Sequence, residues 1–206
     1  MHNKGIYPLI IGLFCVLTGC RSQTILQSTS QEQAFQQRYV GKTFYTAMVL
    51  RPYEFTDAYL IDLTGTIAGA PVQTPRSSLT IPLGTPIEVT ALANEHVIAR
   101  IGEYSLPFRI LVLTKLGTLD TLSEELSLLL AESAPLQSAR LPMRPFITRQ
   151  EVTPGMSRRE VFMSWGQPDK IISSPGASGF LEEWTYFDRQ IRLYLSNGFI
   201  TNWQQY

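Results

Sequence analysis

The hydrophobic and polar positions of this 206-residue chain change pattern twice. Residues 6–17 are almost continuously apolar, residues 39–115 contain short β-branched and aromatic runs broken by turn residues, and residues 153–203 begin with a helical pattern and continue as alternating runs. A period of two residues is typical of strands, and a period of 3.6 residues is typical of helices. The sequence therefore predicts a mixed α+β protein.

The first folded region is predicted to span residues 38–133 and to be a compact antiparallel β unit. Turn residues such as Pro82-Leu83-Gly84-Thr85-Pro86 separate its strands, and this turn with the strand after it weakly resembles part of a small SH3-like barrel. A helix over residues 121–132 closes the unit, because Thr121 and Glu124 have capping-box spacing before a leucine stripe. The predicted strands are residues 43–50, 58–63, 78–81, 87–92, 97–101 and 108–114.

Residues 134–147 contain three prolines and neither periodicity, so they are predicted to be a linker without regular structure. The second folded region, residues 148–206, begins with a short helix whose two ends are marked. Ser157 and Glu160 have capping-box spacing at its start, and Gly166 ends it in a left-handed conformation.

An antiparallel meander is predicted after that helix. Val161 and Trp165 share the helix face that should pack on the sheet, while Trp184 and Tyr186 share one face of a strand. Asn197-Gly198 predicts a type I′ hairpin turn, because both turn positions need a positive φ. The predicted strands are residues 170–173, 181–187, 190–195 and 199–203.

The first 19 residues have the layout of a lipoprotein signal peptide. The apolar residues 6–17 are shorter than the about 20 residues that a membrane-spanning helix needs. Leu17-Thr18-Gly19-Cys20 resembles the lipobox of bacterial lipoproteins, which implies cleavage before Cys20 and acyl chains on its sulfur. Residues 20–37 are rich in Ser, Gln and Thr and are predicted to be a flexible tether, with a short helix over residues 30–39 as the alternative.

Composition and motif spacing give no support for catalysis. The 17 Lys and Arg residues balance the 17 Asp and Glu residues, which disfavours a nucleic-acid partner. His96 is the one histidine after the signal peptide, so with Cys20 lipidated the usual zinc ligands cannot be assembled. Glu124-Glu125 and Glu182-Glu183 are adjacent pairs, whose carboxylates point in different directions. We predict no enzyme, no metal site and no cofactor.

Aromatic side chains gather in the last predicted hairpin. They are Tyr194, Phe199, Trp203 and Tyr206. Tyrosine and tryptophan are enriched at the centres of protein interfaces, so these four residues are the candidate interaction surface. The alternative is that they form the inner face of the small sheet and its C-terminal edge.

Short motifs follow one another through the second region in a set order. They are Gly155-Met156, Gly166-Gln167-Pro168, Trp184-Thr185-Tyr186, Asn197-Gly198-Phe199-Ile200 and Trp203. With these motifs, residues 150–206 resemble the SmpA/OmlA/BamE family of outer-membrane lipoproteins. The resemblance implies a helix-and-meander domain, similar also to each half of the β-lactamase inhibitor proteins, that contacts proteins and performs no chemistry. Members of the family are shorter and lack the β-rich first region.

The resemblance and the signal peptide together imply a lipoprotein on the periplasmic face of the outer membrane. Its expected role is that of a non-catalytic scaffold or accessory factor in envelope biogenesis, with outer-membrane β-barrel assembly as the process. Arg21 agrees with this location, since an aspartate after the lipidated cysteine would resemble an inner-membrane retention signal. Two alternatives stay open: the β-rich region binds a cell-wall glycan or peptide, or the inhibitor-like fold blocks an envelope hydrolase.

Overall fold

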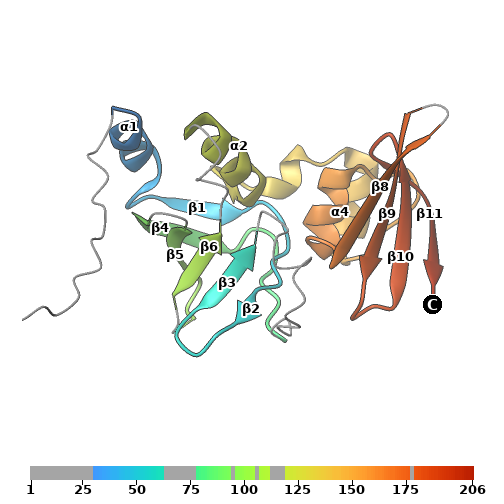
Figure 1. Cartoon of the computed structure of the whole chain (residues 1–206), viewed down its shortest axis with the longest axis horizontal. Coiled ribbons are helices and arrows are strands. Elements are labelled where there is room, and N and C mark those ends of the chain that lie inside the picture. Colours follow the sequence, from blue (N-terminus) through green and yellow to red (C-terminus); the bar gives the residue numbers. More distant parts are fainter. Residues whose placement is uncertain (1–29, 63–77, 94–95, 105–106, 112–118, 177–178) are drawn as a thin grey trace, which may run out of the picture.

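The computed structural model describes residues 30–62, 78–93, 96–104, 107–111, 119–176 and 179–206. Within these ranges the chain has four α-helices and two open sheets, of seven and four strands, so the mixed α+β class is confirmed (Figure 1). The signal peptide, Cys20 and residues 21–29 of the tether lie outside the described residues. No helix of the described part is long and apolar enough to cross a membrane.

The larger sheet has the strand order β2-β3-β6-β5-β4-β1-β7 and is not closed into a barrel. The predicted antiparallel pairing holds except between β3 and β6, which are parallel. The reason is the order of the strands. The hairpin of β4 and β5 pairs through β4 with β1 and through β5 with β6. This order places β6 beside β3, and the two strands run in the same direction. Its strands are β1 (Thr43–Thr46), β2 (Tyr53–Glu54), β3 (Tyr59–Asp62), β4 (Pro86–Ala93), β5 (His96–Ile101), β6 (Phe108–Leu111) and β7 (Leu130–Ala131).

The predicted strand over residues 78–81 is wrong, since a single bridge between Leu50 and Ile81 stands in its place. The helix alternative for residues 30–39 is confirmed, because α1 (Ser30–Tyr39) buries Phe35 and Tyr39 in the core of this sheet. The closing helix is α2 (Leu119–Leu129), with Leu126 and Leu129 in the same core. Figure 1 shows both helices on one side of the sheet.

Residues 135–148 differ from the predicted irregular linker, because they form three consecutive helical turns. These are η1 (Pro135–Ser138), η2 (Leu141–Met143) and α3 (Arg144–Thr148). Proline occupies one of the first two positions of each turn, where its missing N–H would have no partner inside the helix. Ala139 and Ile147 are buried against the second sheet, so this segment belongs to the second core.

The second unit confirms the predicted helix and meander. Its helix is α4 (Arg158–Trp165), which starts with a complete capping box between Ser157 and Glu160. The sheet has the order β11-β10-β9-β8, and Asn197 and Gly198 have the positive φ angles of the predicted turn. Met156, Val161, Trp184 and Tyr186, among others, form the core between α4 and the sheet. The strands are β8 (Lys170–Gly176), β9 (Gly179–Tyr186), β10 (Ile191–Ser196) and β11 (Phe199–Gln205).

The two units are packed directly on each other. The Val49 amide donates to the Phe162 carbonyl of α4 at 3.1 Å, and Phe162 packs against both cores. Arg51 of the first unit forms a 2.8 Å ion pair with Asp188 of the second. The loop around Val49 and the helix α4 therefore fix the space between the two sheets.

Candidate functional site

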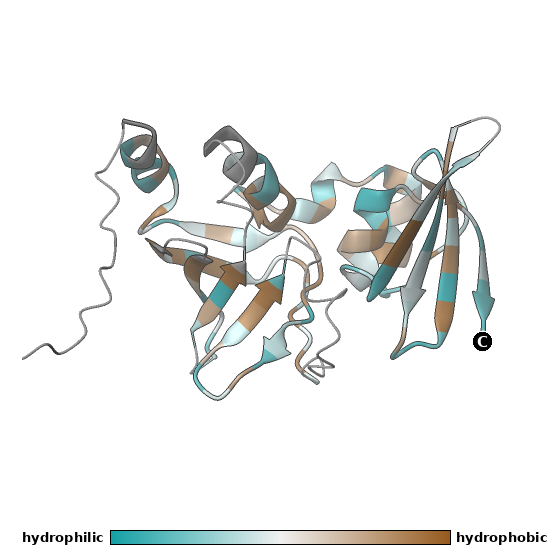
Figure 2. Cartoon of the chain, in the orientation of Figure 1, coloured by the Kyte–Doolittle hydropathy of each residue, from teal (hydrophilic) through white to brown (hydrophobic). Residues whose placement is uncertain are grey.

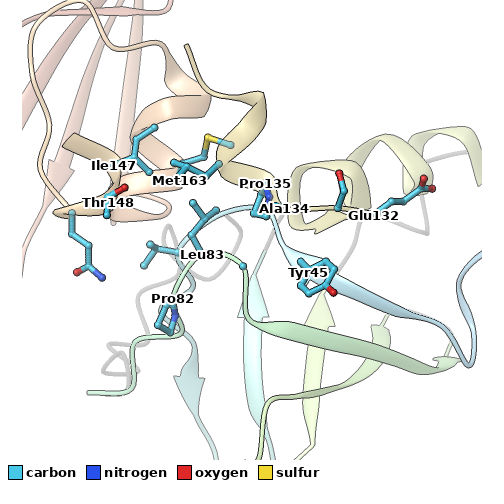
Figure 3. A pocket seen from close by; sticks show the side chains of 14 residues that line it. Tyr45, Pro82, Leu83, Glu132, Ala134, Pro135, Ile147, Thr148 and Met163 are labelled. Carbon is cyan, nitrogen blue, oxygen red and sulfur yellow. The ribbon is translucent and has the colours of Figure 1, made fainter. Parts of the chain in front are cut away.

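An open cavity of about 770 Å³ lies at the junction of the two units. Three segments surround it: the turn with Pro82, Leu83 and Gly84, the segment from Glu132 to Leu136, and the helices α3 and α4 (Figure 3). This volume is in the range of ligand-binding pockets, which are mostly apolar with a few polar groups. The cavity is therefore a candidate binding site.

The wall of the cavity is apolar. Leu83, Ile147 and Met163 all line the cavity and lie close together in Figure 3, although they come from the first unit, α3 and α4. Ile147 and Met163 belong to the buried second core, so their positions are fixed by packing rather than by a bound group. Burying an apolar group against such a wall gains about 25 cal/mol per Å² of area removed from water.

Polar side chains lie at both ends of the cavity. Tyr45 and Glu132 lie at the end away from Ile147, while Thr148 lies at the other (Figure 3). The Thr148 hydroxyl donates to the Arg144 carbonyl at 2.9 Å, so its proton is already used. Glu132 is the one charged side chain of the lining. This lining suits binding of an apolar group with a polar or cationic end.

The buried carboxylate of helix α4 belongs to a structural hydrogen-bond network. Glu160 is 4% exposed and accepts from Arg140 Nε at 2.9 Å and from the Ser157 amide at 2.8 Å. Burial alone would raise its pKa, but the hydrogen bonds from Arg140 and Ser157 outweigh burial and lower the pKa of Glu160 to about 2. Glu160 is therefore an ionised helix cap and is not placed to act as a base.

A second buried carboxylate is engaged in the same way. Glu182 accepts from Arg158 and, at 2.9 Å, from the Trp184 indole Nε1. Its neighbour Glu183 lies on the other face of β9 and is 3.6 Å from Arg192. The predicted divergence of this pair is therefore confirmed. In the part of the chain that the structure describes, no three His, Cys, Asp or Glu residues are grouped as a metal site.

The predicted interaction surface is divided between two faces of the small sheet. Tyr194 is paired with Asn202, and Trp203 is paired with Leu193. Directly opposite residues of neighbouring strands point to the same side, so Trp203 shares the side of the buried Leu193 and Tyr194 lies on the other. Trp203 is still about half exposed, because β11 is the edge of the sheet.

The other two predicted residues are each covered in part by an arginine. Arg140 lies 5.6 Å from the centre of the Phe199 ring, near the start of α4, and Arg192 lies 4.9 Å from that of Tyr206. Both rings are about half exposed. The hairpin therefore carries three separate half-exposed rings and the partly buried Tyr194 rather than one patch.

Sequence reasoning missed a second group of exposed apolar residues. Ile171, Ile172, Phe180 and Leu181 of β8 and β9 are all more than 45% exposed. A signal was present in the sequence, since each pair of adjacent apolar residues must place one side chain on each face of a strand. Only one of the two faces is covered by α4 (Figure 1). These residues lie at the opposite edge of the sheet from Trp203.

Comparison with protein-family models, with curated proteins and with solved structures finds no match to this chain. By its fold, the chain is a two-unit α+β protein with an apolar cavity at the junction of its units.

Proposed function

We propose that this chain is a lipid-anchored, non-catalytic binding protein of the bacterial envelope, held on the periplasmic face of the outer membrane through Cys20. The observation that carries the proposal is Leu17-Thr18-Gly19-Cys20 at the end of the apolar residues 6–17. Several acyl chains on one cysteine make a stable anchor, because each buried methylene contributes about 0.8 kcal/mol. The protein acts as a scaffold or accessory factor in envelope biogenesis, and outer-membrane β-barrel assembly is the process to test first.

The geometry of the second unit supports protein contact rather than chemistry. Its buried carboxylates Glu160 and Glu182 are engaged by arginines, whereas Phe199, Trp203 and Tyr206 keep about half of their surface exposed. Half-exposed aromatic rings beside guanidinium groups are typical of interface centres.

The cavity favours one second candidate function, which is binding of a cell-wall peptide or glycan. The turn that weakly resembles an SH3-like barrel supplies Pro82 and Leu83 to the cavity wall, and Glu132 offers a carboxylate to a cationic end. A peptide with an apolar side chain and a free amine would satisfy both groups.

The test is a crosslinked pull-down from fractionated membranes. It compares wild type with Cys20→Ala and with the triple variant Tyr194→Ala, Trp203→Ala and Tyr206→Ala. Asn202→Ala, on the same hairpin, is the matched control. We expect wild type and Asn202→Ala to co-purify from the outer membrane with β-barrel assembly subunits, and the triple variant to lose them. Capture of sacculus fragments alone would replace this role with the second candidate.

A further inference from the structure

The edge of the four-stranded sheet at β8 is open along its whole length. All seven residues from Lys170 to Gly176 pair with β9, and β8 is the last strand in the sheet order. Six of the seven are exposed. Within the described residues, no backbone hydrogen bond joins β8 to any segment other than β9. Its outward N–H and C=O groups therefore face solvent.

The other sheet edges are shorter or partly covered. β2 and β7 have two residues each. The start of β11 is covered by the segment before α4, since the Gly155 amide donates to the Ile200 carbonyl at 2.7 Å and the Ile200 amide donates to the Met156 carbonyl at 2.8 Å. β8 is thus the longest uncovered edge in the described part of the chain.

The middle of β8 lacks the usual protection of an edge strand. Proteins protect edges with charged residues, proline or bulges, because an exposed row of backbone groups pairs with other chains. Lys170 and Pro175 stand near the two ends of β8, but residues 171–174 have neither, and the register with β9 is unbroken. Ile171 and Ile172 are 50% and 46% exposed in this stretch, and Figure 2 shows a hydrophobic part of β8.

From this geometry we propose that β8 receives an extended peptide segment of a partner protein, which adds as a fifth strand to the sheet. Only another extended backbone satisfies a row of alternating donors and acceptors, whereas a lipid tail leaves them unpaired. The inference rests on β8 alone and holds whether or not Cys20 is lipidated.

The side chains beside this edge specify the chemistry of the segment. Ile172 lies on the outer face, in register with Glu183, and Leu181 lies on the same face of β9. Ile171, in register with Trp184, lies on the face toward α4. An added strand of four to five residues, about 13–17 Å long, has an apolar neighbour on each face. The fitting partner is an extended segment with apolar or β-branched side chains.

A second copy of this chain fits the edge less well. Directly opposite residues share a face, so two antiparallel β8 strands must pair with one residue at the centre. Centring on Ile172 pairs the two Ile172 side chains but places Ile171 opposite Ser173 and Lys170 opposite Ser174. Centring on Ile171 pairs the two Ile171 side chains but places Lys170 opposite Ile172, so each register forms a single isoleucine pair. Apolar and β-branched cross-strand pairs are the ones that stabilise a sheet. The edge therefore favours a different chain.

The test measures binding of a fluorescent nine-residue peptide of alternating valine and threonine to the purified full chain by anisotropy. We expect saturable binding, weakened at least about tenfold by Ile172→Lys, which places a charge on the edge. The matched control Asn202→Lys on β11 should change the dissociation constant less than about twofold. Circular dichroism checks that both variants keep the fold.

Two N-methylated peptides separate strand addition from simple apolar contact. One carries methyl groups on alternate amides and keeps one free edge, which it can turn toward β8, and the other carries a methyl group on every amide and keeps no N–H donor. We expect the first peptide to bind and the second to fail. Equal binding of both, or no saturable binding of the parent peptide up to about 1 mM, overturns the proposal. Dimerisation that Ile172→Lys abolishes would assign the edge to a second copy and overturn it as well.

Discussion

Gly166 joins the two units at a point where no other residue fits. Its φ is +76°, and a Cβ atom added to it would lie 2.3 Å from the Val49 carbonyl oxygen. The same carbonyl belongs to the residue whose amide donates to Phe162 of α4. A glycine that the sequence marks as a helix end is thus also the contact that lets the first unit approach α4.

Gly166→Ala should lower the free energy of unfolding by about 3 kcal/mol or more, because it combines left-handed strain with a backbone clash. Gly41→Ala is the matched control, since Gly41 has φ +75° but nothing within 4 Å of an added Cβ. Urea denaturation should show a loss of about 1 kcal/mol for the control, from strain alone. Equal losses for the two variants would contradict the contact with Val49.

Helix α4 shows which elements can be predicted from sequence and why. Local features were predicted correctly, because the residues that determine each of them are close together in the sequence. They are the capping box of Ser157 and Glu160, the turn at Asn197 and the meander. The partner of Glu160, Arg140, lies 20 residues away in a segment predicted to be an irregular linker. Periodicity does not reveal proline-started helical turns, because each is too short to repeat.

The pairing of strands that are distant in the sequence could likewise not be predicted from local sequence patterns. The parallel contact of β3 with β6 and the open edge at β8 depend on how whole hairpins are ordered in the sheets. The cavity also needs side chains from both units, such as Leu83 and Met163, which no spacing rule connects. Only the tertiary packing brings these groups together.

The capping box of α4 makes the free energy of unfolding depend on pH in the acid range. The pKa of Glu160 falls from 4.5 to about 2 in the folded chain, so the fold favours its ionised form. This contribution is complete above pH about 4.5 and is lost as the pH falls through 2. Glu160→Gln should lower the free energy of unfolding at pH 7 by about 2 kcal/mol and flatten its decline between pH 4.5 and 2.

Glu151→Gln is the control for this prediction, because Glu151 is half exposed and its ion pair with Arg149 is at the surface. Exposed pairs contribute about 0–1 kcal/mol. Denaturant titrations across the pH range, read by circular dichroism, distinguish the two variants. An acid profile of Glu160→Gln that matches wild type would show that the cap is not ionised in the folded chain.

At the scale of the whole molecule, the two cores are expected to unfold together. Phe162 stacks on Trp184 with ring centres 5.1 Å apart and also packs against the first core. All three tryptophans belong to the second unit, so their fluorescence reports that unit, while far-ultraviolet circular dichroism reports the whole chain. A shared interface couples the two signals.

The wild-type fluorescence and circular dichroism transitions should therefore coincide. Phe162→Ala should lower the shared stability by about 3 kcal/mol, since it empties a position that both cores contact. Phe55→Ala, at an exposed position of the first unit, should change it by less than about 0.5 kcal/mol. Two separate transitions in the wild type would show that the units fold independently.

The proposed role depends on attachment to the membrane through Cys20. The direct measurement is intact mass spectrometry of wild type and Cys20→Ala, each purified from fractionated cells. We expect wild type to begin at Cys20, to carry the mass of acyl chains and to sediment with the outer membrane, and we expect Cys20→Ala to lack the acyl mass. Wild-type protein without acyl mass in the soluble periplasm would contradict it.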